Sequence, residues 1–281
     1  MKINKDSLKA RANNIAKELG ISQNVVYDRF FYDAFLARLS KSPYKDQFVL
    51  KGGLYLSSVL GIDNRSTMDL DFYLSKTKME KGNIVSIIVK IASLNINDGV
   101  TFVFCGESTI REDDLYGGFQ VTLLGKMDNV KHQFNIDVAT GDPIVPSERN
   151  YDYKCLVTGE VLPLKAYSLE SVVSEKLETV LAKGISNSRS KDFYDLFVLR
   201  KTLQKEINNN HLIKAFKQTC EYRAFIESKE GALKTLEEIK NNSMIRIRWT
   251  SYGKKVGYAK DITLDEVIDA IKEWVEIVYK R

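Results

Sequence analysis

Histidine and cysteine are scarce in this sequence. Its 281 residues include two histidines, His132 and His211, and three cysteines, Cys105, Cys155 and Cys220. So few histidines argue against a histidine-based mechanism or a histidine-rich metal site. The cysteines are far apart and form no CxxC pair, which argues against a zinc site or a disulfide framework and fits a reducing compartment.

Long apolar runs are also missing. No segment of the sequence approaches the roughly 20 apolar residues that a membrane-spanning helix needs, and the first residues lack the hydrophobic core of a signal peptide. We therefore expect a cytoplasmic protein with no membrane partner. The apolar fraction of 44% predicts an ordinary core, and the net charge of +5 permits a nucleic-acid partner without requiring one.

The pattern of predicted elements changes near residue 165. We expect an α+β chain with two domains, a mixed β-sheet flanked by helices over 1–165 and a helical domain over 166–281. Predicted strands cover 48–50, 68–74, 100–105, 119–124, 134–139 and 161–164. Predicted helices cover 6–19, 23–39, 54–60, 79–92, 168–183, 190–201, 207–220, 229–241 and 263–279, whereas 244–260 is expected to be irregular.

Serines mark the starts of three predicted helices. Ser22, Ser168 and Ser190 are expected N-caps, because a serine oxygen can accept a hydrogen bond from a free N–H of the first turn. The helix after Ser22 has a strong apolar face, and Arg29 and Arg38 are expected outside it. In the plainest interpretation, this helix packs on the following sheet.

Residues 51–74 combine two features that suit a metal–nucleotide site. Gly52 and Gly53 open a helical pattern, so bare backbone N–H groups can face a phosphate. Asp69 and Asp71 are one residue apart in a predicted strand, which puts both carboxylates on one face about 7 Å apart. Such a pair can bind a divalent cation. Arg65 lies between the two features, each of which is common when it occurs alone.

Asp137 is a third candidate carboxylate. In the predicted strand 134–139 it faces away from Ile136 and Val138. If this strand lies beside the strand of Asp69 and Asp71, three carboxylates surround one or two Mg²⁺ ions, which activate an attacking hydroxyl and offset charge on a phosphate. The alternative is an ordinary solvent-facing aspartate.

Three charged residues of the helical half need an explanation. Lys176 borders the buried stripe of helix 168–183, so its stem either covers apolar surface on the way to solvent or carries the ammonium to a triphosphate. Asp192 falls in the first turn of the next helix, where a carboxylate is favourable. Asp195 is surrounded by apolar residues and is expected to have a partner.

Together these residues resemble the AbiEii/AbiGii toxin family of nucleotidyltransferase-like proteins. The resemblance covers about half the chain, in four ordered segments: KGG with RSTMDLDF (51–72), FNIDVATGDP (134–143), AYSLESVVSEKLETVL (166–181) and SRSKDFYDL (188–196). It implies a nucleotidyltransferase fold in which the helical domain forms the other side of a cleft.

The resemblance also implies roles for individual residues. Asp69, Asp71 and Asp137 would bind metal, and Lys176 would contact the nucleotide phosphates. Asp192 would complete the catalytic set. Nucleotide binding would involve Gly52, Gly53, Arg65 and Lys176.

The function implied by the resemblance is that of a toxin in a toxin–antitoxin, abortive-infection system of phage defence. Such a protein would be a Mg²⁺-dependent nucleotidyltransferase that uses an NTP to modify RNA, with the 3′ end of tRNA as the expected acceptor. Its partners would be the NTP, the RNA and an antitoxin encoded nearby.

One departure from the family keeps other functions open. Leu54 stands where the family often has Ser or Thr after the two glycines, and Ser57 and Ser58 are a turn further on. The chain could therefore bind an NTP and sequester a partner without turnover. A third alternative keeps the catalytic site and changes the acceptor, so that the enzyme modifies a protein. The basic and aromatic stretch 244–260 is either an RNA contact, by charge and stacking, or a solvated loop.

Overall fold

The computed structural model describes residues 4–65, 67, 69–75, 81–110 and 118–280. The chain forms two units. The first comprises Met1–Gly141 and Arg149–Ala166, and the second comprises Asp142–Glu148 and Tyr167–Arg281. The domains 1–165 and 166–281 remain a prediction about which parts of the chain fold independently.

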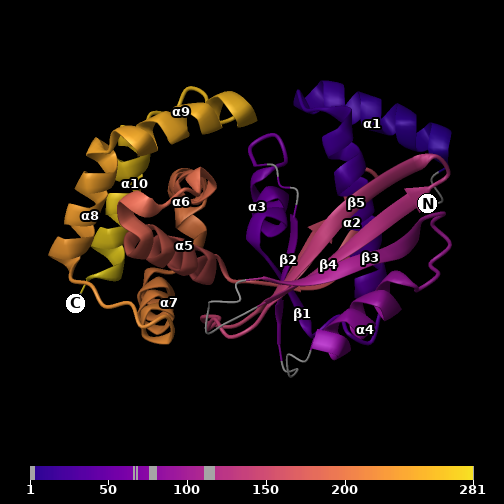
Figure 1. Cartoon of the computed structure of the whole chain (residues 1–281), viewed down its shortest axis with the longest axis horizontal. Coiled ribbons are helices and arrows are strands. Elements are labelled where there is room, and N and C mark those ends of the chain that lie inside the picture. Colours follow the sequence, from indigo (N-terminus) through magenta and orange to yellow (C-terminus); the bar gives the residue numbers. More distant parts are fainter. Residues whose placement is uncertain (1–3, 66, 68, 76–80, 111–117, 281) are drawn as a thin grey trace. The chain divides into compact units, whose positions relative to one another are not determined.

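Strands of the first unit form one mixed sheet. Within the described residues seven strands pair in the order β3-β4-β5-β2-β1-β7-β6. Figure 1 labels β1 to β5 of this sheet. β2 is parallel to β5 and β1 to β7, and the other neighbours are antiparallel. The predicted mixed sheet is confirmed, and β6 is a strand that the sequence did not reveal. The strands are β1 (Phe48–Lys51), β2 (Asp69–Leu74), β3 (Thr101–Ile110), β4 (Gly118–Met127), β5 (Val130–Ala139), β6 (Arg149–Lys154) and β7 (Val161–Ala166).

Helix α2 provides much of the core of this unit. Ser22 caps it as predicted. Its Tyr32 packs on Phe134 of β5, with ring centroids 5.2 Å apart, and its Phe35 packs on Phe72 of β2 at 6.4 Å. Aromatic burial of this kind fixes the helix against one face of the sheet. The helices of the described part of this unit are α1 (Lys5–Leu19), α2 (Gln23–Lys41), α3 (Gly52–Leu60) and α4 (Lys81–Ala92).

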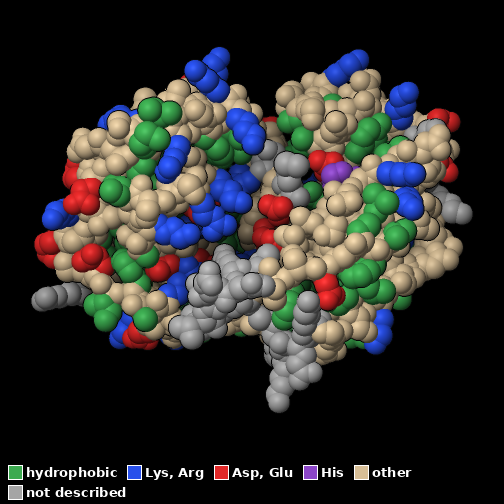
Figure 2. All heavy atoms as spheres, in the orientation of Figure 1, with side chains coloured by type: hydrophobic (Ala, Val, Ile, Leu, Met, Phe, Trp, Pro, Cys, Tyr) green, Lys and Arg blue, Asp and Glu red, His purple; other side chains and the backbone are tan. Residues whose placement is uncertain are grey.

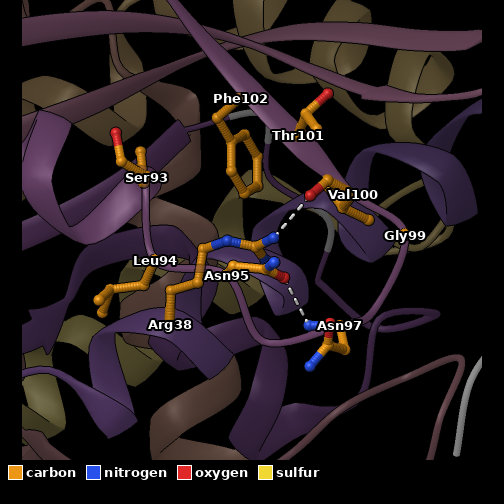
Figure 3. Close-up of a pocket in the computed structure, with 10 residues that line it drawn as sticks. Arg38, Ser93, Leu94, Asn95, Asn97, Gly99, Val100, Thr101 and Phe102 are labelled. Carbon is orange, nitrogen blue, oxygen red and sulfur yellow. Dashed lines mark hydrogen bonds between the residues drawn. The ribbon is translucent and has the colours of Figure 1, made fainter.

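Arg29 and Arg38 of α2 are buried, which corrects the expectation that they lie outside its apolar face. Their exposed fractions are 5% and 2%. Arg38 donates to the carboxylate of Asp98, at 2.7 and 2.9 Å, and to the carbonyl oxygen of Val100 at 2.7 Å. It lines a pocket of about 470 Å³ beside the start of β3 (Figure 3). The guanidinium therefore holds the turn before β3 against α2.

Arg29 belongs to a second buried cluster, which joins α2 to α3 and β6. Its Nη1 donates to Ser57 Oγ at 3.1 Å, and its Nε lies 3.5 Å from Asp33 Oδ1. The Asp33 carboxylate also accepts hydrogen bonds from the Tyr153 hydroxyl, at 2.5 Å, and from the Leu156 N–H, at 2.7 Å. Burial raises the pKa of Asp33 to about 6, although Arg29 and these hydrogen bonds act in the opposite direction.

The second unit is helical, as predicted. Trp274 of α10 is fully buried and donates its indole N–H to the Leu196 carbonyl oxygen of α6 at 3.0 Å. Arg223 contacts both Asp142 (2.9 Å) and Glu178 (2.6 Å), which ties the segment 142–148 to α5. None of the described helices is both long and apolar enough to cross a membrane. The α-helices of the described part of this unit are α5 (Leu169–Lys183), α6 (Ser190–Thr202), α7 (Asn209–Tyr222), α8 (Lys229–Asn241), α9 (Ser243–Val256) and α10 (Leu264–Val278).

Helix α9 contradicts the prediction that 244–260 is irregular. Its Trp249 is only 4% exposed and donates its indole N–H to the Ile262 carbonyl oxygen at 2.8 Å. The Tyr252 and Tyr258 hydroxyls lie 3.1 Å apart, and both rings pack near Tyr194 of α6. The aromatic residues that suggested base stacking are therefore part of the packing of this unit.

The raised pKa of Asp33 predicts how stability depends on pH. The folded protein holds this proton more tightly than the unfolded chain, in which an aspartate has a pKa of about 3.9. The contribution of Asp33 to the free energy of unfolding therefore decreases as the pH rises from about 4 to about 6, by up to about 3 kcal/mol, and is constant above that interval.

Denaturant unfolding across this interval tests the prediction. The free energy of unfolding of the wild-type protein, minus that of Asp33→Asn, should fall with rising pH. The same difference for Asp46→Asn, which changes an exposed carboxylate, should stay constant. A constant difference for Asp33→Asn would contradict the assignment.

Candidate active site

Asp69, Asp71 and Asp137 lie on one face of the sheet. Along β2, alternate residues are buried, and the two aspartates fall on the half-buried side. The parallel register of β2 with β5 sets Asp71 beside Asp137 and Asp69 beside Asn135. Residues that are neighbours in register point to the same side of a sheet. The condition set by the sequence, that the two strands are neighbours, is met, and the three carboxylates share a face.

Strand β4 supplies polar partners to this face. The side-chain amide of Gln120 donates to Asp137 Oδ1 at 2.9 Å, and the Thr122 hydroxyl donates to Asn135 Oδ1 at 2.9 Å. Both pairs follow from the antiparallel register of β4 with β5. The Asp137 carboxylate is therefore held in a fixed orientation by its neighbour.

The Gly52–Gly53 turn lies directly against Asp71. The backbone N–H of Gly53 donates to Asp71 Oδ2 at 3.2 Å, so a carboxylate sits at the positive end of α3. Gly52 has a φ of +63°, and a Cβ there would lie 2.6 Å from Asp71 Cγ. A Cβ on Gly53 would lie 2.8 Å from the Cβ of Thr67. Both positions therefore require glycine.

Arg65 packs against the same turn. It is 4% exposed, and one of its terminal nitrogens lies 3.4 Å from the position that a Cβ on Gly53 would take. Leu54 is fully buried in the core. The Ser57 hydroxyl accepts a hydrogen bond from Arg29, and the Ser58 hydroxyl contacts the Tyr55 carbonyl oxygen and the Tyr151 hydroxyl. The two serine hydroxyls are thus engaged within the first unit.

The three carboxylates are chemically suited to a divalent cation and share one face of the sheet. Carboxylate oxygens are the ligands that Mg²⁺ takes in proteins, and the register of β2 with β5 puts three such residues on one face. As the side chains stand, no group of three or more His, Cys, Asp or Glu among the described residues converges on a metal position. The metal roles of Asp69, Asp71 and Asp137 therefore stay a prediction.

Lys176 is held by two carboxylates in the second unit. Its ammonium lies 2.7 Å from Asp192 Oδ1 and 2.8 Å from Asp195 Oδ2. The Asp195 side chain is completely buried, and the Lys176 side chain is 15% exposed. Lys176 therefore does not extend to solvent, and Asp195 has the partner that its apolar surroundings required.

The charge of Lys176 also acts on Asp192. Burial alone would raise the pKa of Asp192, but the nearby ammonium and its hydrogen bond outweigh burial and hold that pKa below its ordinary value.

Ser168 caps α5 as predicted. The prediction for Ser190 is wrong, because α6 begins at Ser190 itself and no side chain caps it.

The predicted site residues thus fall into two groups. The first unit brings together Gly52, Gly53, Arg65, Asp69, Asp71 and Asp137, and the second brings together Lys176 and Asp192. That the two groups serve one nucleotide stays a prediction. The structure adds three residues that contact the candidate site residues, namely Gln120, Thr67 and Asp195. Of these, only Asp195 had a signal in the sequence, because it is an acidic residue within an apolar helix.

Comparisons with known proteins bear on the family and the fold of the chain. The family model of the nucleotidyl transferase AbiEii toxin, type IV toxin–antitoxin system, matches residues 34–273. No curated protein matches the sequence. A crystal structure from Helicobacter pylori, described as a nucleotidyltransferase, is similar with a TM-score of 0.50 and 16% identity, over 92% of this chain and 96% of that chain. JHP933 from Helicobacter pylori gives a TM-score of 0.49 and 15% identity, over 92% and 93%. The predicted nucleotidyltransferase fold is confirmed.

The packing of Asp71 on Gly52 predicts a specific loss of stability. Gly52→Ala should lower the free energy of unfolding by at least about 1 kcal/mol more than Gly20→Ala. Gly20 has a similar φ of +64° but open space around it, so both variants carry backbone strain and only Gly52→Ala displaces Asp71. Urea unfolding of the two variants measures the difference. Equal losses would show that Asp71 does not pack on the turn.

The contact between Lys176 and Asp195 predicts strong energetic coupling. In a double-mutant cycle, Lys176→Met and Asp195→Asn should couple by at least about 1 kcal/mol. Lys176→Met removes the ammonium that lies against the buried Asp195 carboxylate, and Asp195→Asn removes one of the two carboxylates that hold this ammonium. The exposed pair Lys234–Glu238, at 4.0 Å, is the control and should couple by less than about 0.5 kcal/mol. Similar coupling in both cycles would contradict a buried charge cluster.

Proposed function

The chain belongs to the family of AbiEii nucleotidyl transferase toxins of type IV toxin–antitoxin systems, and we propose that it is a metal-dependent enzyme that transfers a nucleotide from an NTP to RNA. The proposed acceptor is the 3′ end of tRNA, whose modification would arrest growth. One observation carries the proposal: Asp71 lies beside Asp137 and also against the Gly52–Gly53 turn. Carboxylates and a phosphate-binding turn in direct contact suit phosphoryl transfer from a metal-bound nucleotide.

The Gly52–Gly53 turn is the proposed phosphate-binding element. It forms the start of α3, where backbone N–H groups and the helix dipole favour an anion. Asp71 packs against the two glycines, and the buried Arg65 lies beside the turn and adds positive charge there. Because Leu54 is buried, this element relies on backbone groups and Arg65 rather than on a hydroxyl.

Asp69, Asp71 and Asp137 would hold one or two Mg²⁺ ions. Bound there, the cation would offset the charge of the triphosphate and favour ionisation of the attacking hydroxyl. Gln120 keeps Asp137 oriented. In the proposed reaction the acceptor hydroxyl oxygen forms a bond to the α-phosphorus while the bond to pyrophosphate breaks. The hydroxyl proton passes to a carboxylate of this group or to water.

Lys176 and Asp192 are proposed to act on the same nucleotide. Lys176 would contact its phosphates, and Asp192 would orient the ammonium through their 2.7 Å contact. Asp195 is proposed as the positioning residue that fixes Lys176 from the buried side.

Membership in a toxin–antitoxin family implies an antitoxin as a functional partner. We propose that its gene lies beside the gene for this chain, that both proteins act in the cytoplasm, and that the pair serves in phage defence.

Loss of the carboxylate at position 71 should abolish nucleotide transfer. We expect Asp71→Asn to lower incorporation of labelled NTP into tRNA by at least about 100-fold, because metal binding and phosphate charge both depend on it, and to relieve growth arrest. Asp152→Asn, which removes an exposed carboxylate from β6 of the same sheet, should keep full activity. Chelation of divalent cations should stop the wild-type reaction, and added Mg²⁺ should restore it.

Each other outcome points to a different function. If no NTP is incorporated into any RNA, but an NTP binds in calorimetry and is recovered intact, the chain acts by sequestration. If intact-mass analysis shows the added nucleotide on a protein, the acceptor is a protein. Undiminished activity of Asp71→Asn would refute the metal role of this carboxylate.

A further inference from the structure

Helix α9 has two distinct faces. Its buried face consists of Ile245, Trp249 and Gly253, spaced four residues apart. The opposite face is exposed along the whole helix and contains Met244, Ile247, Arg248, Ser251, Lys254 and Lys255. Residues with this spacing line one side of a helix. We call Arg248, Lys254 and Lys255 the α9 basic face.

The charge of α9 is entirely positive. The helix carries four basic residues and no acidic one. Arg246 is paired with Asp265 at 2.9 Å. No ion pair among the described residues involves Arg248, Lys254 or Lys255, and all three side chains are exposed. The α9 basic face thus presents cations that the fold itself does not use.

Tyrosines in and after α9 pack on Tyr194, near the start of α6. Tyr194 of α6 lies 4.7 Å from Tyr258 and 6.3 Å from Tyr252, measured between ring centroids. Tyr252 is one turn before Lys255, and Lys191 is one turn before Tyr194. Figure 2 shows Lys and Arg side chains gathered over the region of α5, α6 and α9. Helix α9 therefore packs on the helix that carries Asp192.

We propose that the α9 basic face binds the phosphate backbone of the acceptor RNA. The proposal rests on the proposed function, which makes RNA the polyanion that this enzyme must hold. Trp249 is buried and the nearby tyrosines pack on one another, so α9 offers charge rather than base stacking. Binding through phosphates alone is independent of sequence and depends strongly on salt.

The salt dependence of RNA binding tests the proposal. Anisotropy of labelled bulk tRNA is measured between about 50 and 200 mM KCl, for the wild type and for Arg248→Gln, Lys254→Gln, Lys255→Gln combined. Each lost phosphate contact removes about 0.7 to 0.9 from the slope of log K against log salt, so the slope should decrease by about 2 to 3. The affinity at low salt should fall by about tenfold or more.

A matched control separates local from general charge effects. The control is a triple variant, Lys214→Gln, Lys217→Gln, Lys234→Gln, which removes the same charge from exposed lysines on α7 and α8. The slope of log K against log salt for this variant should differ from the wild-type slope by no more than the loss of about one phosphate contact would cause. Equal NTP affinity in calorimetry would show that both variants are correctly folded. If the α9 variant keeps the wild-type slope, or if it changes only the self-association of the protein in sedimentation, the inference is overturned.

The proposed function and this inference can fail separately. If the wild type transfers no nucleotide to RNA, yet the α9 variant shows the reduced slope, the RNA-binding face stands and the catalytic proposal falls. If transfer occurs and both variants bind tRNA as the wild type does, the catalytic proposal stands and the α9 basic face has no role in RNA binding.

Discussion

The parallel pairing of β2 with β5 determines where the acidic side chains of the first unit lie. One side of β2 is apolar, and its Leu70 and Phe72 are almost completely buried. A slip of one residue would turn these side chains outward and move the aspartates into the core. Exposing two large apolar side chains costs several kcal/mol, at about 1.5 to 3 kcal/mol each. Burial of the core therefore specifies the face on which Asp69, Asp71 and Asp137 stand.

The glycine turn depends on the same register. β1 pairs with β2 so that Lys51 lies opposite Asp71, and the chain then turns into α3 at Gly52. Because no Cβ intervenes, the first turn of α3 can approach Asp71 closely enough for the Gly53 N–H to donate to its carboxylate. The register of β1 with β2, the turn at Gly52 and the start of α3 therefore depend on one another. A change to any of the three would move the Asp71 carboxylate.

Sequence patterns revealed this arrangement because its causes are local. Alternation along β2 and β5 predicted which aspartates share a face, and paired glycines predicted the turn. The partners of the buried cations were not predictable in the same way, since Arg38 and Asp98 are 60 residues apart. β6 was missed because Tyr153 is its only buried side chain. α9 was missed because its few buried residues are separated by basic ones, which hides the apolar period.

Buried cations connect distant elements in both units, and these contacts bear on specificity more than on stability. A buried ion pair gains little net free energy, because desolvation offsets most of the attraction, whereas an unpartnered buried charge is costly. Any packing that separates Arg38 from Asp98, or Lys176 from Asp195, is therefore penalised strongly. Arg29 also donates to Ser57 of α3, and Lys176 joins α5 to α6. The contacts that exclude wrong packing thus involve the helices that carry the candidate site residues, so the fold and the site are specified together.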